Sequence, residues 1–122
     1  AARGLLGLGP GLTPSGDDFL GGAMIALKFL GEIAIRETLW KFLKKETLKL
    51  TNPISHAHLT AAYFGFGSEV LHDLLTFIFL GKTRQISATI HHIGKIGHTS
   101  GWDALSGAFI VLTAWKDRKI FV

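Results

Sequence analysis

The stretch Gly7-Leu8-Gly9-Pro10-Gly11-Leu12-Thr13-Pro14-Ser15-Gly16-Asp17-Asp18 runs from a glycine-rich loop directly into an apolar segment. Glycine lets the backbone take positive φ angles and approach a neighbour closely, and proline stiffens a turn. Ser15 stands where the N-cap of a helix belongs, and Asp18 follows at close to capping-box spacing. We therefore expect the amides after Ser15 to point outward at the positive end of the helix dipole, as free donors for a phosphate or carboxylate.

A second copy of this helix start lies near the end of the chain. Residues 15–27, SGDDFLGGAMIAL, align without gaps on residues 100–112, SGWDALSGAFIVL, with eight of thirteen positions identical. Two apolar helices readily share Leu, Ala and Ile by chance, but not the Ser-Gly-x-Asp that opens both segments. Gly107 falls on the position of Gly22, so we expect the two repeat helices to cross there.

The remaining apolar positions recur at helical spacing between Gly, Pro, Asn and Ser breaks, and no segment reads convincingly as a strand. The sequence predicts an all-α fold in which the two related loop-helix repeats pack together. Residues 1–14 are expected to form a loop. Six helices are expected at about 17–30, 32–45, 53–64, 69–80, 83–94 and 102–115.

Composition excludes several functional classes. Net charge is +4, but Lys and Arg are scattered, so neither a basic arm nor an RNA-binding motif indicates nucleic acid. No apolar run reaches the roughly 18 residues that span a bilayer. With no signal peptide pattern and no cysteine, we expect a cytoplasmic protein without disulfides or thiolate metal sites. Since 48% of residues are hydrophobic and only 18% charged, we expect buried contact with an absent N-terminal region or other subunits, hence an oligomer.

Residues 7–20, GLGPGLTPSGDDFL, resemble the signature of a bacterial and archaeal family that includes the AllH-like subunit of oxamate carbamoyltransferase, an enzyme of anaerobic allantoin breakdown. Further stretches also resemble blocks of that family: Ile54-Ser55, residues 65–69 with Leu74-Leu75, and residues 97–103. The resemblance implies transfer of a carbamoyl group between carbamoyl phosphate and oxamate, giving oxalurate and phosphate. Because family members are considerably longer, it also implies that residues 1–122 are a single helical domain from the C-terminal part of such a protein.

The candidate site follows from the two helix starts. If they converge, they form a pocket of amides, hydroxyls and carboxylates for a small anionic substrate. Asp18 and Asp103 correspond in the repeat and are the candidate catalytic carboxylates, with His98 as a donor to a bound oxyanion. Alternatively, Asp17 and Asp18 hold Mg²⁺ and bridge it to a phosphate. The candidate anion-binding residues are Gly9, Gly11, Thr13, Ser15, Gly16, Thr99, Ser100 and Gly101.

Two other interpretations remain open. A first-turn carboxylate also stabilises its own helix, by about 0.3–1 kcal/mol, and the glycines then serve helix packing in a non-catalytic subunit. The chain is otherwise a phosphate- or nucleotide-binding enzyme of unknown substrate, although the loop lacks the Gly-Lys-Ser/Thr of a Walker A motif. Zinc is disfavoured, because the six histidines form no His-x-x-x-His pair.

Overall fold

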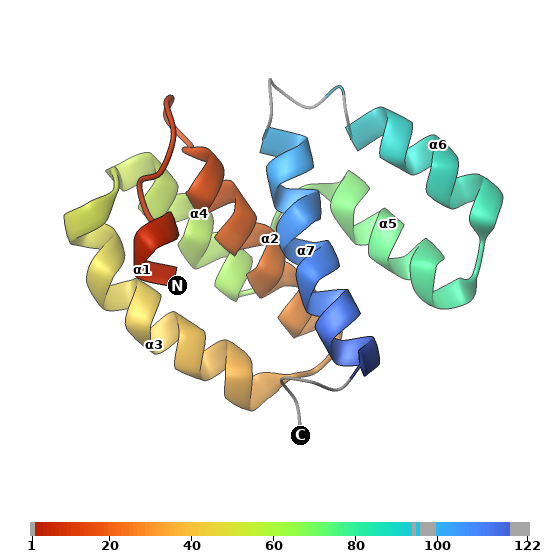
Figure 1. Cartoon of the computed structure of the whole chain (residues 1–122), viewed down its shortest axis with the longest axis horizontal. Helices are drawn as coiled ribbons and strands as arrows, with labels where there is room; N and C mark the ends of the chain where they lie inside the picture. The colour runs from red at the N-terminus through yellow and green to blue at the C-terminus, as the bar shows by residue number, and fades with distance from the viewer. Residues whose placement is uncertain (1, 94, 96–99, 118–122) are drawn as a thin grey trace.

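The structure, a computed structural model, describes residues 2–93, 95 and 100–117 and is helical throughout, without strands in that part of the chain (Figure 1). The predicted all-α class is confirmed. The helices are α1 (Ala2–Leu5), α2 (Ser15–Phe29), α3 (Ile33–Leu50), α4 (Pro53–Tyr63), α5 (Glu69–Leu80), α6 (Thr83–Ile93) and α7 (Ser100–Asp117). Six of them match the six predicted helices.

Several boundaries differ from the prediction, and α7 is longer than expected by two residues at each end. The expected N-terminal loop contains the single helical turn α1. Helix α2 begins at Ser15, which is inside the helix and not its N-cap. Helix α3 continues to Leu50, beyond the expected end at 45, because Glu46 and Thr47 are buried and keep that last turn against the protein.

Helix α2 is the centre of the fold, and it packs on α7, α4, α3 and α1 (Figure 1). Met24 and Ala26 in its middle are completely buried. The most extensive packing joins α2 to α7, the two helices that carry the similar sequences. A helix buried on nearly all sides reads as continuously apolar, which explains why α2 has only a weak polar face.

Glycines set the distance between α2 and α7. A Cβ atom built on Gly22 would lie 1.8 Å from the carbonyl oxygen of Ala104, and one on Gly107 would lie 1.8 Å from that of Phe19. These positions correspond in the sequence alignment, so the contact is reciprocal. The two helices meet backbone to backbone, which only residues without a side chain allow.

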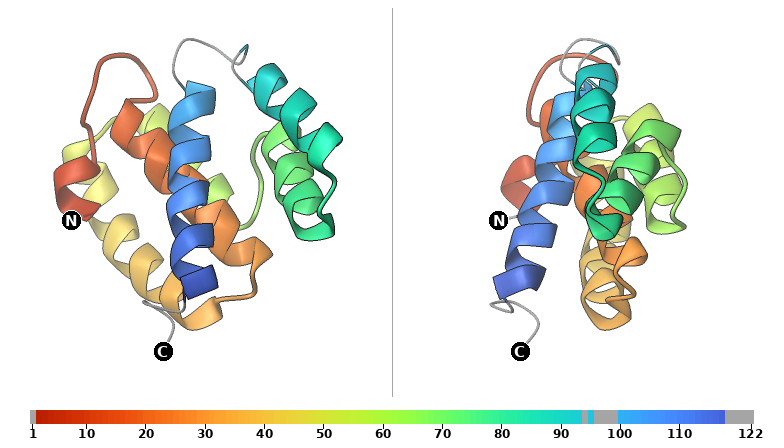
Figure 2. Two further views of the ribbon diagram at one scale, coloured as in Figure 1. Left: turned by 45° about the vertical axis from the view of Figure 1, so that its right-hand side comes forward. Right: turned by 90° about the vertical axis from the view of Figure 1, so that its right-hand side faces the viewer.

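Helices α5 and α6 form a hairpin that packs mainly on itself and projects to one side of the remaining helices (Figure 2). Its turn is made by Gly81, which ends α5 in the left-handed conformation with φ 67°. The ring of Phe79 joins the hairpin to the body, since its centroid lies 5.2 Å from that of Phe29 and 5.6 Å from that of Trp115.

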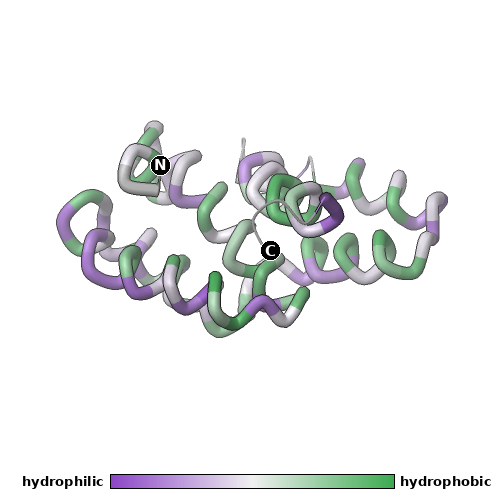
Figure 3. Tube along the Cα trace, turned by 60° about the horizontal axis from the view of Figure 1, so that its bottom comes forward, coloured by the Kyte–Doolittle hydropathy of each residue, from purple (hydrophilic) through white to green (hydrophobic). Residues whose placement is uncertain are grey.

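Hydropathy differs sharply between the outer helices (Figure 3). Helix α3 carries lysines between its buried positions. Helix α5 is apolar over most of its length, although only Leu71, Leu74 and Leu75 are buried. No helix among the described residues is long and apolar enough to cross a membrane.

Candidate functional site

The start of α2 is closed by backbone hydrogen bonds. Pro14 precedes the helix and accepts from the amide of Asp18 at 3.0 Å, and no side chain caps the helix. The amide of Gly16 donates to the carbonyl oxygen of Leu8 at 3.0 Å, within the glycine loop. The expected N-cap role of Ser15 is therefore wrong, and in this conformation the Gly16 amide is not a free donor for an anion.

Asp17 is a structural residue. Only 3% of it is exposed, its Oδ1 accepts from the amide of Gly7 at 2.8 Å, and its Oδ2 accepts from the hydroxyl of Thr51. This carboxylate ties the glycine loop to the residue that follows α3. Each oxygen of Asp17 thus accepts one hydrogen bond within the protein. The described residues contain no group of three or more His, Asp or Glu arranged around a metal ion.

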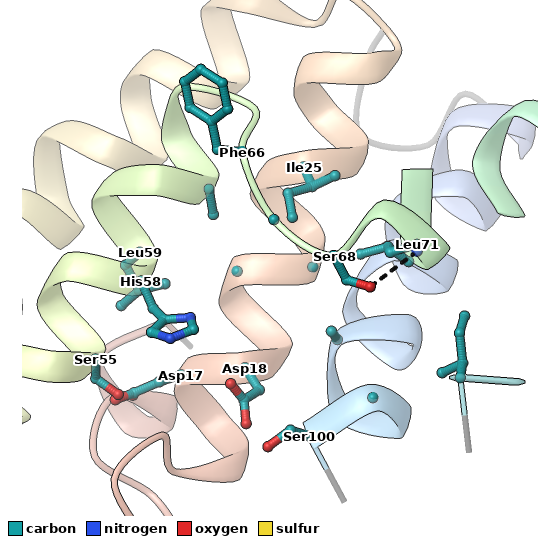
Figure 4. Close-up of a pocket in the computed structure, with 17 residues that line it drawn as sticks. Asp17, Asp18, Ile25, Ser55, His58, Leu59, Phe66, Ser68, Leu71 and Ser100 are labelled. Atoms are coloured by element: carbon teal, nitrogen blue, oxygen red, sulfur yellow. Dashed lines mark hydrogen bonds between the residues drawn. The ribbon is translucent and has the colours of Figure 1, made fainter. Parts of the chain in front are cut away.

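Asp18 points the other way from the same helix turn, toward Ser100 at the start of α7 (Figure 4). Its carboxylate accepts hydrogen bonds from the hydroxyls of Ser100 and Thr13, whose oxygens lie 3.5 Å apart. One oxygen of Asp18, Oδ2, is buried without a hydrogen-bond partner among the described residues, and so is Oδ2 of Asp103. The two helix starts thus share a polar cluster, with two carboxylate oxygens left unsatisfied.

Burial raises the pKa of the Asp18 carboxyl above its ordinary value of 3.8. The hydroxyls of Ser100 and Thr13 oppose this effect by stabilising the charged form, the negative charge of Asp103 adds to it, and His58 weakly lowers the pKa again. A carboxylate with a raised pKa and an unpaired oxygen favours any group that brings a proton or a hydrogen-bond donor to it.

A cavity of about 210 Å³ begins at Asp18 and extends between the helical body and the α5–α6 hairpin (Figure 4). One end of the cavity is polar, because Asp18 and His58 of α4 both line it there, and the opposite walls are apolar. Neither Lys nor Arg is among the described residues that line it. The lining residues that the later argument uses are Asp18, His58, Phe66, Gly67, Ser68 and Ser100.

The comparisons with known proteins agree with the motif at the start of α2. The profile of the family described as oxamate carbamoyltransferase subunit AllH matches residues 5–112. The chain belongs to this family. No solved structure matches the chain.

Only some of the predicted site residues line the cavity. Ser100, Gly101, Asp17 and Asp18 line it, whereas Gly9 and Gly11 lie in the exposed loop with φ values of 112° and 91°. Asp103 is in the first turn of α7 and acts on Asp18 through its charge. His98 and Thr99, both predicted site residues, lie outside the described residues.

The sequence did not lead us to expect that α4 contributes to the cavity. Ser55, His58, Leu59 and Ala62 all line it. Their spacing of three and four residues after the Asn52-Pro53 helix start puts them on one face of α4. That pattern was available in the sequence, but an apolar face with one histidine is also what an ordinary core helix shows.

Proposed function

We propose that this chain acts in carbamoyl transfer by holding the amide end of oxamate at the Asp18 end of the cavity. The single observation that supports the proposal most strongly is the pair of buried, unpartnered oxygens on Asp18 and Asp103. The family description names an oxamate carbamoyltransferase subunit. The reaction we propose is the one that the resemblance implies, in which the nitrogen of oxamate takes the carbamoyl group of carbamoyl phosphate to give oxalurate and phosphate.

The chemistry of the proposed site is positioning. An amide NH2 has two donors, and a carboxylate that accepts from one of them fixes the direction of the nitrogen lone pair toward the carbamoyl carbon. The raised pKa of Asp18 suits a group that accepts a proton from that nitrogen as the new C–N bond forms. Ser100 and Thr13 hold the carboxylate in place through their hydroxyls.

The charge of the cavity argues against the binding of an anionic group beside Asp18, although the helix starts predicted a site for a small anionic substrate. A carboxylate or phosphate placed beside Asp18 meets like charge, and no lysine or arginine among the described lining residues offsets it. We therefore propose that the phosphate of carbamoyl phosphate is bound by groups outside this set, on another subunit or on another part of the protein.

An alternative is a non-catalytic helical subunit, and one observation favours it. The glycine of each Ser-Gly-x-Asp start is pressed on backbone: a Cβ on Gly16 would lie 1.8 Å from the carbonyl oxygen of Leu5, and one on Gly101 would lie 2.4 Å from that of Ile93. Packing alone thus explains these two glycines. Packing does not explain why Oδ2 of Asp18 and Oδ2 of Asp103 have no hydrogen-bond partner among the described residues.

A ligand series tests the proposal by isothermal titration calorimetry. Oxamide, oxamate and oxalate have the same planar two-carbon frame and carry zero, one and two carboxylates. We expect oxamide to bind most tightly, oxamate more weakly and oxalate not measurably. We expect Asp18→Asn to weaken oxamide binding by about 10- to 100-fold, the usual effect of losing a hydrogen bond to a charged group.

Asp73→Asn is the matched control, because Asp73 is an exposed aspartate on α5 outside the cavity. It is expected to leave oxamide binding unchanged. If oxalate bound as tightly as oxamide, the site would be an anion site and the proposal would be wrong. If none of the three bound and Asp18→Asn changed only the stability, the non-catalytic alternative would hold.

A further inference from the structure

The imidazole of His72, in the first turns of α5, lies between two backbone carbonyl groups. Its Nδ1 is 2.9 Å from the carbonyl oxygen of Ser68, and its Nε2 is 2.8 Å from that of Gly65. A carbonyl oxygen only accepts hydrogen bonds, and a neutral imidazole has a single N–H. Only a ring with a proton on both nitrogens satisfies both contacts.

His56 provides an internal contrast. Its Nδ1 lies 2.6 Å from the hydroxyl oxygen of Thr47. A hydroxyl both donates and accepts, so this contact persists whether Nδ1 carries a proton or not. The requirement for a doubly protonated ring therefore applies to His72 and not to His56.

The two carbonyls bonded by His72 are the ends of the turn at residues 65–68, which connects α4 to α5. Gly65 has φ 87°, and the amide of Phe66 donates back to Ala61 at 2.9 Å, which closes the end of α4. Ser68 is the N-cap of α5 and accepts from the amide of Leu71 (Figure 4). The His72 ring thus fastens the start of the α5–α6 hairpin to the end of α4.

This turn is also a wall of the cavity. Phe66, Gly67 and Ser68 line it on the side where the hairpin meets the body (Figure 4). Besides this turn, the buried side chains of Leu71 and Leu75 and the ring of Phe79 hold the hairpin against the body. The two His72 hydrogen bonds therefore join residues at both ends of a segment that lines the cavity.

We propose that doubly protonated His72 is a positioning residue that holds the turn at 65–68 and the α5–α6 hairpin against the body. Loss of one ring proton turns a donor into an acceptor that faces a carbonyl oxygen, and the turn loosens. The two hydrogen bonds therefore hold the turn only while both ring nitrogens carry a proton. This role in the turn does not depend on the proposed function.

The ring has no acidic side chain as a hydrogen-bond partner in the described part of the chain. The side chain of Lys28 on α2 lies against Gly65, its ε-carbon 3.0 Å from the position of a Cβ there. Its ammonium group carries the same sign of charge as a doubly protonated ring and so opposes double protonation, whereas the two carbonyl oxygens favour it. The other ionisable groups of the elements around the turn are Asp17 and Asp18 of α2, His56, His58 and Tyr63 of α4, Glu69 and Asp73 of α5, Lys82 before α6, Arg84, His91 and His92 of α6, and Asp103, Lys116 and Asp117 of α7.

Two measurements on the unmodified chain test the proposal. Nitrogen-15 spectra of the imidazoles at pH about 5.5 are expected to show protons on both ring nitrogens of His72. Amide exchange, corrected for its intrinsic pH dependence, is expected to show about a tenfold loss of protection at Phe66 and His72 between pH about 5.5 and 8, which corresponds to one hydrogen bond. The amide of Leu30 at the end of α2, bonded to Ala26 at 2.9 Å, is expected to keep its protection.

His72→Gln is expected to abolish this pH dependence and to leave the protection of Phe66 low throughout, whereas His92→Gln on the exposed surface of α6 is expected to behave like the unmodified chain. A His72 ring with one proton at pH about 5.5, or protection at Phe66 that is equal at pH about 5.5 and 8, would overturn the proposal. If His72→Gln does not fold, the two measurements on the unmodified chain still decide. If oxamide does not bind, the proposed function fails while the role of His72 is decided by the same spectra.

Discussion

Gly22→Ala is expected to destabilise the protein by about 3–5 kcal/mol, at the upper end of what a single overpacking substitution causes. The added Cβ would lie 1.8 Å from the carbonyl oxygen of Ala104, where contacts under 3.0 Å are essentially never found. That carbonyl belongs to the backbone of α7 and cannot rotate away, so the central pair of helices must separate. Thermal unfolding followed by circular dichroism should show a melting temperature lower by about 10–20 °C, or no folded protein.

Gly21→Ala is the matched control, one residue earlier on the same helix. Its nearest atoms, on Ala62 and Leu59, are 3.9 Å from the new Cβ, which is ordinary contact. Since alanine favours a helix over glycine by roughly 0.5–1 kcal/mol, this variant is expected to melt at the same temperature or slightly higher. Gly107→Ala is expected to resemble Gly22→Ala, because its Cβ would meet the carbonyl oxygen of Phe19 at 1.8 Å. Equal melting temperatures for Gly21→Ala and Gly22→Ala would show that α2 and α7 do not pack backbone to backbone.

The sequence predicted the helices well because their signals are local. Asn52-Pro53 at the start of α4, Ser68 at the start of α5 and Gly81 at its end act within one turn of backbone, and each performs the expected role. The extra turn of α3 was missed because it depends on tertiary burial of Glu46 and Thr47, which no local pattern reports.

The site was predictable only in part, because the direction in which a helical side chain points depends on the fold. Asp17 and Asp18 are identical in type and occupy the same helix turn, yet Asp17 is fully bonded to Gly7 and Thr51 while Asp18 faces the start of α7. Successive residues on a helix point about 100° apart, and which direction meets solvent, a loop or a cavity depends on the fold. The repeat alignment was more informative, because it singled out Asp18 and Asp103 and not Asp17.

Asp18→Asn is expected to stabilise the protein at neutral pH, by about 2–5 °C in melting temperature, the usual range for a stabilising substitution in a domain of this size. Because the pKa of Asp18 is raised by burial, the charged carboxylate is less favourable in the folded protein than in the unfolded chain. Near pH 3.5 the carboxyl is largely protonated in the folded state and carries no such penalty. As the pH rises through the raised pKa the penalty appears, so the advantage of asparagine should grow between pH 3.5 and 7 and then stay constant.

Asp17→Asn separates this effect from a general helix-start contribution, since both aspartates stand in the first turn of α2 and both substitutions remove a charge there. Asparagine at 17 offers one acceptor and one donor group where two donors, the Gly7 amide and the Thr51 hydroxyl, need acceptors. We expect a loss of about 2–4 kcal/mol, a cost typical of a broken buried hydrogen-bond network. Melting curves of both variants at several pH values should therefore move in opposite directions at pH 7. If the two variants moved together, Asp18 would be only a helix-stabilising residue, and a loss of oxamide binding in Asp18→Asn would lose its meaning as evidence for a site.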